Sequence, residues 1–319
     1  MRHGPGRAGG GRDRTGVLMP ARQPAPADAP IGVFDSGIGG LTVLAALTRA
    51  LPDERFIYLG DTARLPYGTK SGATVTRYAV QAAAALLRRG VKFLVVACNT
   101  AASVGLDAVR AGSAGVPVVG VIEPGAEAAV RASPSGHIAV IATEATVRGG
   151  AYRQAILRRR PAAQVTEQPA QLLVAMAEEG VHEGPLAHAA VRHYLGTLFD
   201  SQAAPDTLVL GCTHFPLLKP AIRDVIGPGT RLVDSAETTA AAVRQQLQMA
   251  GLVRAGGASQ RTAAQHAAVR DAPADRGGPE SAEPSLLFLA TDSPERFARV
   301  GGRFLGRSLA AGDVELMDL

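Results

Sequence analysis

The chain has 319 residues, of which 46% are hydrophobic and 19% are charged, and its formal net charge is +5. This length accommodates two α/β domains of ordinary size. Aromatic residues make up only 4% and tryptophan is absent, which argues against the stacking platforms that bind nucleic acid. Residues 1–30 hold five arginines against two aspartates, so most of the excess charge lies at one end and no basic stripe for nucleic acid is predicted.

Residues 1–29 are rich in glycine, proline, alanine and arginine, a composition that predicts a disordered tail. Their single apolar patch, 17–19, is too short for the core of a signal peptide. No stretch elsewhere has the length of a transmembrane helix. We therefore expect a cytoplasmic protein without a membrane partner, and the sequence leaves open whether translation begins at Met1 or Met19.

Short apolar runs alternate along the chain with amphipathic or alanine-rich stretches, which is the pattern of strand–helix–strand units. The predicted strands are 31–34, 56–59, 93–97, 116–122, 137–141, 208–210, 231–233 and 286–290. The predicted helices are 41–50, 74–89, one that begins at 101, 151–160, 171–179, 186–198, 236–250 and 294–310. The stretch 255–285 is polar and has no periodicity, so we expect a disordered surface insertion there.

The glycine-rich turn 35–40 follows the first predicted strand. It has features of a dinucleotide-binding loop, but Thr42 stands where the third glycine of that fingerprint belongs. Asp35 at the start of the turn would also repel a pyrophosphate. We therefore expect the turn to present Asp35 and Ser36 to a ligand, with its glycines allowing close backbone approach.

Pro66-Tyr67-Gly68 follows the second predicted strand and forms a turn. A free backbone N–H at Gly68 suits the binding of a carboxylate group. The alternative, a turn that only connects two elements, is equally compatible with these residues.

Cys98 stands where the strand 93–97 ends and a helix begins, and Cys212 stands in the same kind of place after the strand 208–210. Ligands of parallel α/β sheets bind at this edge. A helix N-terminus there favours negative charge, which predicts a stabilised thiolate. Two buried structural cysteines or a disulfide are the alternatives; the absence of other cysteines and of an export signal argues against a disulfide.

An internal repeat accounts for the matching cysteines. Asp35 ends a strand 63 residues before Cys98, and Thr143 ends a strand 69 residues before Cys212. Two copies of one strand–helix module explain these spacings. The predicted fold class is therefore α/β, with two pseudo-symmetric domains, mostly parallel sheets, and an active site in the cleft between them.

Two thiols on opposite sides of a carbon atom suit the inversion of a stereocentre, because one can remove a proton while the other returns one. The ordinary thiol pKa of about 8.5 allows both protonation states near neutrality, and His214 could assist Cys212. Neither the cysteines nor the histidines have metal-ligand spacing. Lys70, Lys92 and Lys219 lie in no recognisable Schiff-base site. We therefore expect no metal and no cofactor.

Several segments resemble the signatures of the glutamate racemases in the aspartate/glutamate racemase family, and they occur in the family's order. The resemblance covers about residues 31–254 and 286–319. The segments are Asp35-Ser36-Gly37-Ile38-Gly39-Gly40, Pro66-Tyr67-Gly68, Ala97-Cys98-Asn99-Thr100, Thr146-Val147-Arg148-Gly149-Gly150-Ala151-Tyr152, Gly211-Cys212-Thr213-His214-Phe215-Pro216 and Ser293-Pro294-Glu295-Arg296-Phe297.

The resemblance implies a cofactor-independent enzyme that interconverts L- and D-glutamate and supplies D-glutamate for peptidoglycan. It makes Cys98 and Cys212 the two acid/base thiols, with Cys98 serving D-glutamate and Cys212 serving L-glutamate. It places Asp35 beside Cys98 and His214 beside Cys212. The family also has a glutamate that partners the histidine, in a Cys-Pro…Glu-Glu-Gly segment. Here that segment reads Gln168-Pro169…Glu178-Glu179-Gly180, so Glu178 is the candidate.

The same resemblance distributes the binding residues over the parts of a glutamate molecule. Asp35 and Ser36 would hold the amino group. The side-chain carboxylate would bind in the Pro66 turn, at Tyr67 and Gly68. The α-carboxylate would be held by three further residues, which are Asn99, Thr100 and Thr213, beside His214.

The family's topology implies one domain of residues 30–122 plus 237–319 and a second of residues 123–236, whereas the repeat alone suggests a cut near 135. Two other functions stay open. One is a related racemase that acts on aspartate, and the other is an amino-acid-binding or partner-binding protein without catalysis. The sequence does not settle the oligomeric state, a homodimer included, or regulation by cell-wall precursors.

Overall fold

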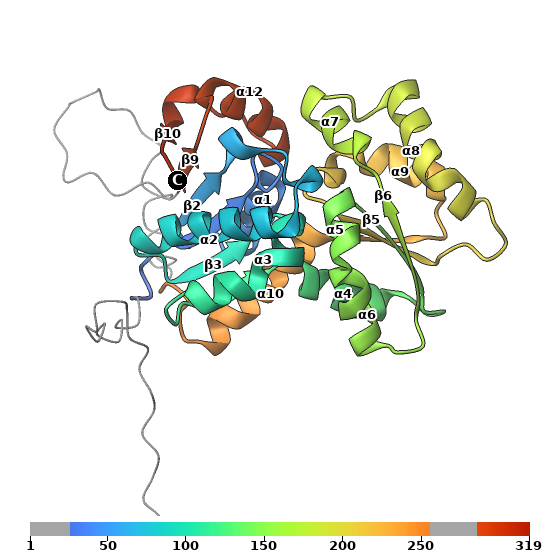
Figure 1. Ribbon diagram of the computed structural model, residues 1–319, viewed down its shortest axis with the longest axis horizontal. Coiled ribbons are helices and arrows are strands. Elements are labelled where there is room, and N and C mark those ends of the chain that lie inside the picture. The colour runs from blue at the N-terminus through green and yellow to red at the C-terminus, as the bar shows by residue number, and fades with distance from the viewer. Residues whose placement is uncertain (1–25, 256–285) are drawn as a thin grey trace, which may run out of the picture.

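The computed structural model describes residues 26–255 and 286–319. It contains two parallel β-sheets that lie side by side, each flanked by helices (Figure 1). The larger sheet has six strands in the order β10-β9-β2-β1-β3-β4. These strands are β1 (Ile31–Asp35), β2 (Phe56–Gly60), β3 (Phe93–Val96), β4 (Val118–Gly120), β9 (Leu286–Ala290) and β10 (Val314–Leu316).

The smaller sheet has four strands in the order β6-β5-β7-β8. They are β5 (His137–Ala142), β6 (Gln164–Pro169), β7 (Thr207–Gly211) and β8 (Arg231–Asp234). This order repeats that of β2-β1-β3-β4 in the larger sheet, and all strand pairs in both sheets are parallel. The predicted fold class, two pseudo-symmetric α/β units with parallel sheets, is confirmed.

Helices cover the sheets because most of the strands are apolar, as is usual for parallel strands with two buried faces; the edge strand β6 is polar. The helices beside the larger sheet are α1 (Leu41–Ala50), α2 (Gly72–Arg88), α3 (Asn99–Gly112), α10 (Ser235–Met249) and α12 (Pro294–Leu305). Those beside the smaller sheet are α4 (Ile122–Ala132), α5 (Glu144–Gly149), α6 (Ala151–Arg159), α7 (Leu172–Glu179), α8 (Gly184–Phe199) and α9 (Lys219–Ile226). Short 3-10 helices are η1 (Thr62–Arg64), η2 (Tyr67–Thr69), η3 (Phe215–Leu218) and η4 (Ala311–Asp313).

The helices pack in groups that join the two halves. In the larger half α2 packs on α3, and α1 packs against both α10 and α12. In the smaller half α4 packs on α6, and α8 packs on α7 and α9. Helix α10 also contacts α4, so the chain returns from the second sheet along an interface between the halves. Figure 1 shows α12, in red, facing α7 across the two halves.

The structure differs from the predicted elements at several places. The stretch 116–122 is not one strand: β4 spans only Val118–Gly120, and α4 begins at Ile122. Pro124 lies in the first turn of α4, where proline is tolerated because its missing N–H would have no helical partner. Strands β6 and β10 and helices α5 and α9 were not predicted. The last helix ends at Leu305 rather than near 310, because Gly306 takes a left-handed conformation with φ of 75°.

The predicted tail 1–29 needs a correction at its end. Residues 26–29 form a turn in which the Ala29 N–H donates to the Pro26 carbonyl at 2.9 Å, and the Lys92 ammonium donates to the Ala27 carbonyl. The rest of the tail and the predicted insertion lie outside the described residues. The domain limits remain predictions. No helix within the described ranges is long and apolar enough to cross a membrane.

Candidate active site

The two cysteines lie at the carboxyl ends of equivalent strands, one in each sheet. Cys98 follows β3 and precedes α3, and Cys212 directly follows β7. Both thiols are unpaired and buried, and both line one cavity between the halves. The cysteines therefore approach the same space from two sheets.

Nine other residues predicted from the sequence line this cavity. They are Ser36, Pro66, Tyr67, Gly68, Asn99, Thr100, Glu178, Thr213 and His214. Asp35 is the exception: it is buried and does not line the cavity. The cavity volume is about 30 Å³, which holds one or two water molecules. This volume is smaller than that of an amino acid.

Cys98 has a polar but strongly buried environment. Its S–H donates to Ser36 Oγ at 3.6 Å, and its sulfur accepts from the Ala101 N–H at 3.4 Å. Burial, followed by the negative charge of Asp35, raises the pKa of Cys98 to about 12 and outweighs these hydrogen bonds. The prediction of a stabilised thiolate at this helix N-terminus is therefore wrong for Cys98, which is a thiol at neutral pH.

Asp35 lies beneath the turn that follows β1. Its Oδ2 accepts from the Gly37 N–H at 3.1 Å, and its Oδ1 has no hydrogen-bond partner within the described chain. Burial raises the pKa of Asp35, although the nearby His214 opposes this effect. Asp35 does not line the cavity, and its charge contributes to the raised pKa of Cys98.

Cys212 lies beside the imidazole of His214, whose other ring nitrogen contacts Glu178. His214 Nδ1 lies 3.7 Å from Cys212 Sγ, and His214 Nε2 lies 3.1 Å from Glu178 Oε1. Burial lowers the pKa of His214, but the hydrogen bonds with Cys212 and Glu178 outweigh burial and raise it to about 10. His214 is therefore an imidazolium at neutral pH, and its Nδ1 faces the Cys212 sulfur.

Unpartnered polar atoms lie in the cavity wall between the cysteines. Asn99 Oδ1 accepts from the Tyr152 hydroxyl at 2.7 Å, whereas Asn99 Nδ2 has no hydrogen-bond partner among residues 26–255 and 286–319. The side-chain oxygen of Gln171 also lacks one in these ranges. Buried polar atoms are normally hydrogen-bonded, so these two groups suit contact with a polar ligand.

The walls of the cavity are fixed by contacts between the halves. The hydroxyl of Thr100 on α3 lies 2.9 Å from that of Thr143, at the start of α5. Thr42 on α1 donates to the Thr213 carbonyl at 3.0 Å. Gly39 leaves no room for a side chain, because a Cβ there would overlap His214 and Thr213. The hydroxyl of Tyr67 donates a hydrogen bond to the buried carboxylate of Asp61.

The sequence did not predict six residues of the cavity wall, which are Gly37, Ile38, Leu65, Thr143, Gln171 and Val174. The repeat contained a signal for Thr143, because this residue ends its strand as Asp35 does in the first module. Gln171 and Val174 flank the start of α7 and carry no local signal. Their place in the wall depends on how α7 packs across the cavity.

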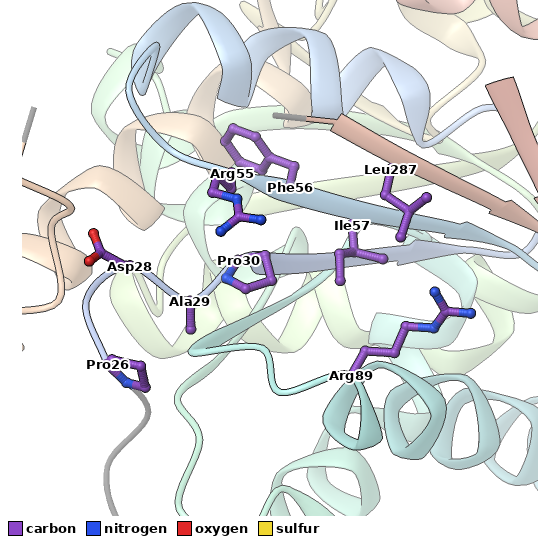
Figure 2. Close-up of a pocket in the computed structure, with 9 residues that line it drawn as sticks. All are labelled: Pro26, Asp28, Ala29, Pro30, Arg55, Phe56, Ile57, Arg89 and Leu287. Atoms are coloured by element: carbon purple, nitrogen blue, oxygen red, sulfur yellow. The ribbon is translucent and has the colours of Figure 1, made fainter. Parts of the chain in front are cut away.

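A second hollow, of about 810 Å³, lies at the opposite edge of the larger sheet (Figure 2). Its lining includes Phe56 and Leu287, at the amino ends of β2 and β9, with the side chains of Arg55 and Arg89 nearby. Ligands of parallel sheets bind at the carboxyl edge, so we do not assign the reaction to this hollow. The described residues contain no group of three histidine, cysteine or acidic side chains that could hold a metal ion.

Comparisons with known proteins give the family of this chain. Residues 31–243 match the model of the Asp/Glu/Hydantoin racemase family. The chain is 46% identical to a glutamate racemase of Geobacter metallireducens over 289 residues, which cover 91% of this chain and 96% of the relative. The solved glutamate racemase of Francisella tularensis, in complex with D-glutamate, has a TM-score of 0.77 and 32% identity over 92% of this chain and 98% of its own.

A solved glutamate racemase of Thermus thermophilus, in complex with β-chloro-D-alanine, has a TM-score of 0.72 and 41% identity. That match covers 92% of this chain and 98% of the other. The similarity thus extends over both sheets and nearly the whole of each relative. The chain belongs to the Asp/Glu/Hydantoin racemase family.

Proposed function

We propose that this chain is a glutamate racemase, which interconverts L- and D-glutamate with two thiols and no cofactor. The observation that carries the proposal is that Cys98 and Cys212, from equivalent strands of two sheets, line one cavity. The names of the relatives support glutamate as the substrate, since the Francisella enzyme was solved with D-glutamate and an Escherichia coli enzyme with L-glutamate. The D-glutamate would supply peptidoglycan, as the family implies.

The two cysteines have different surroundings. Cys212 Sγ lies 3.7 Å from Nδ1 of the His214 imidazolium, and burial keeps Cys98 protonated. In the direction from L- to D-glutamate, the Cys212 thiolate removes the proton from Cα and becomes a thiol. The Cys98 thiol then donates its proton to the opposite face of the same carbon and becomes a thiolate. The reverse direction uses the same groups with their roles exchanged.

The remaining cavity residues hold the substrate in this proposal. The free Nδ2 of Asn99 can donate to the α-carboxylate, and Thr100 and Thr213 line the same cavity. Negative charge that develops at the carboxylate during proton removal is stabilised by such fixed donors. Ser36 would contact the amino group, and the turn that contains Gly68 would bind the side-chain carboxylate.

Solvent exchange tests the proposal. The purified protein, without added cofactor, is incubated in D₂O with L- or D-glutamate, and parallel samples contain L- or D-aspartate. Circular dichroism follows the loss of optical activity, and NMR follows deuterium at Cα. We expect glutamate of either hand to racemise, with deuterium in the product before it enters the remaining substrate. Racemisation of aspartate but not of glutamate would show that aspartate is the substrate. Absence of deuterium exchange with both amino acids would contradict catalysis.

A further inference from the structure

Arg296 on α12 lies outside the cavity, yet it binds the carboxylate that holds His214. We propose that Arg296 is a positioning residue for the Cys212 half of the reaction and that it acts through Glu178 and His214. This inference rests on the proposed function, because it assigns one half of a two-thiol reaction to one chain of contacts.

The contacts run without a break from the protein surface to the thiol. Arg296 Nη2 donates to Glu178 Oε2 at 3.0 Å, and Glu178 Oε1 lies 3.1 Å from His214 Nε2. His214 Nδ1 lies 3.7 Å from the sulfur of Cys212. Along this path the exposed fraction of the side chain falls from 42% at Arg296 to 15% at Glu178 and 8% at His214. Each group therefore orients the next, more deeply buried one.

Helix α12 supports the same pair through two further residues. Arg303 Nη1 donates to the Glu178 carbonyl at 3.2 Å, at the C-terminus of α7, where a cation is favourable. Gly180 ends α7 with φ of 80°, and a Cβ there would lie 2.6 Å from Arg303 Nη1. The ring of Phe304 packs edge-on against His214, with the ring centres 5.1 Å apart.

Helix α12 packs on α1 in the larger half, whereas α7 belongs to the smaller half. The end of the chain thus fixes a catalytic group of the opposite half (Figure 1). Cys98 depends on other residues, since its sulfur interacts with Ser36 and Ala101 on the other wall. The effect of Arg296 should therefore be one-sided.

Orientation, rather than charge, explains the effect. Arg296 is partly exposed, so water and salt screen its charge. A hydrogen bond between a guanidinium and a carboxylate nevertheless has a defined geometry. It selects one rotamer of Glu178, and that rotamer fixes the ring of His214. Outer partners that orient a functional histidine act in the same way at metal sites.

Racemisation rates cannot isolate one thiol, because both thiols act in each direction. Elimination of a β-leaving group from a β-substituted glutamate needs only one base. Its rate therefore reports on one thiol alone. In the Cys98→Ala protein Cys212 is the sole base and acts on the L-analogue. In the Cys212→Ala protein Cys98 is the sole base and acts on the D-analogue. Arg296→Gln is added to each of the two proteins.

We expect Arg296→Gln to slow elimination by Cys212 roughly ten- to hundredfold, since small misplacements of a catalytic group cost this much. Elimination by Cys98 should change by less than about twofold on the same argument, because its geometry is untouched. Arg296→Lys should recover part of the rate, because it keeps a cationic donor. Arg299→Gln, at an exposed arginine of the same helix, is the matched control and should change neither rate. Far-UV circular dichroism checks that each variant is folded.

The pH profile separates positioning from a general structural effect. Glu178 is faced by His214 at the start of η3, by Arg296 and Arg303 of α12, and by its neighbour Glu179. Burial raises the pKa of Glu178, but hydrogen bonds from His214 and Arg296 outweigh it and lower the pKa. Loss of the hydrogen bond from Arg296 raises the pKa of Glu178. As the pH is lowered, elimination by Cys212 in the Arg296→Gln protein should therefore be lost at a higher pH than with Arg296 present.

Equal losses of elimination rate for Cys98 and Cys212 would overturn the role of Arg296 alone. So would an acid limb of the Cys212 pH profile that Arg296→Gln does not move. A Cys98→Ala protein that eliminates from neither analogue would overturn the proposed function as well, before Arg296 is substituted. The two failures are therefore distinguishable.

Discussion

Gly39 of the larger half lies against His214 and Thr213 of the smaller half, and its replacement by alanine tests whether this close approach sets the geometry of the site. A Cβ on Gly39 would meet the ring of His214 and the hydroxyl of Thr213. Both distances fall about 1 Å short of an ordinary contact, and a close-packed interior cannot absorb that overlap without movement. His214 must therefore retreat from its position beside Cys212.

We expect the kcat of racemisation in Gly39→Ala to fall about a hundredfold, because a displacement of about 1 Å costs this much. Overpacking should also lower the free energy of unfolding by about 1–3 kcal/mol. Circular dichroism measures the conversion of L-glutamate, and urea unfolding measures stability. Gly112→Ala is the matched control, since a Cβ at this last residue of α3 meets nothing within 4 Å. A turnover of Gly39→Ala within about threefold of the unsubstituted protein would refute the reasoning, since the stated displacement costs far more.

Three further predictions concern stability, binding and pH. Lys92→Met should lower the free energy of unfolding, measured in urea, by about 3–5 kcal/mol. The substitution leaves the buried carboxylate of Glu54 without the Lys92 ammonium, which lies 2.6 Å away. A loss below about 1 kcal/mol would contradict this prediction. Tyr152→Phe removes the hydroxyl that donates to Asn99. It should lower the free energy of unfolding by about 1–3 kcal/mol and raise the KM for glutamate. An unchanged KM would show that Asn99 does not bind the substrate. In the Cys212→Ala protein, the rate at which iodoacetamide alkylates Cys98 should rise about tenfold per pH unit up to pH 10, because only the thiolate reacts. Burial raises the pKa of Cys98 to about 12. A rate that reaches a plateau by about pH 8 would refute this raised pKa.

Parts of the fold were predictable from the sequence because they rest on local patterns. Strand β3 is a continuous apolar run, which burial on both faces requires. Strand β6 is polar, since it forms the edge of the smaller sheet and its proline stands at the end. Its sequence therefore lacks the apolar pattern of a strand. The start of α4 was predicted as a strand because Ile122 continues an apolar run up to Pro124.

The candidate site divides in the same way. Cys98 and His214 stand in short motifs beside strand ends, so the sequence indicates them directly. Gln171 and Arg296 reach the site through the packing of α7 and α12, and no local pattern reports such contacts. The state of Cys98 was mispredicted for a related reason. A helix N-terminus is visible in the sequence, whereas the burial that outweighs it arises only in the folded chain.

The central claim is that two thiols act on opposite faces of one carbon atom. The most direct measurement is the enantiomer preference of Cys98→Ala and Cys212→Ala, with the L- and D-forms of a β-substituted glutamate that carries a good leaving group. We predict that both proteins fail to racemise glutamate, that Cys98→Ala eliminates only from the L-analogue, and that Cys212→Ala eliminates only from the D-analogue. The same preference in both proteins, or normal racemisation by either one, would contradict the claim.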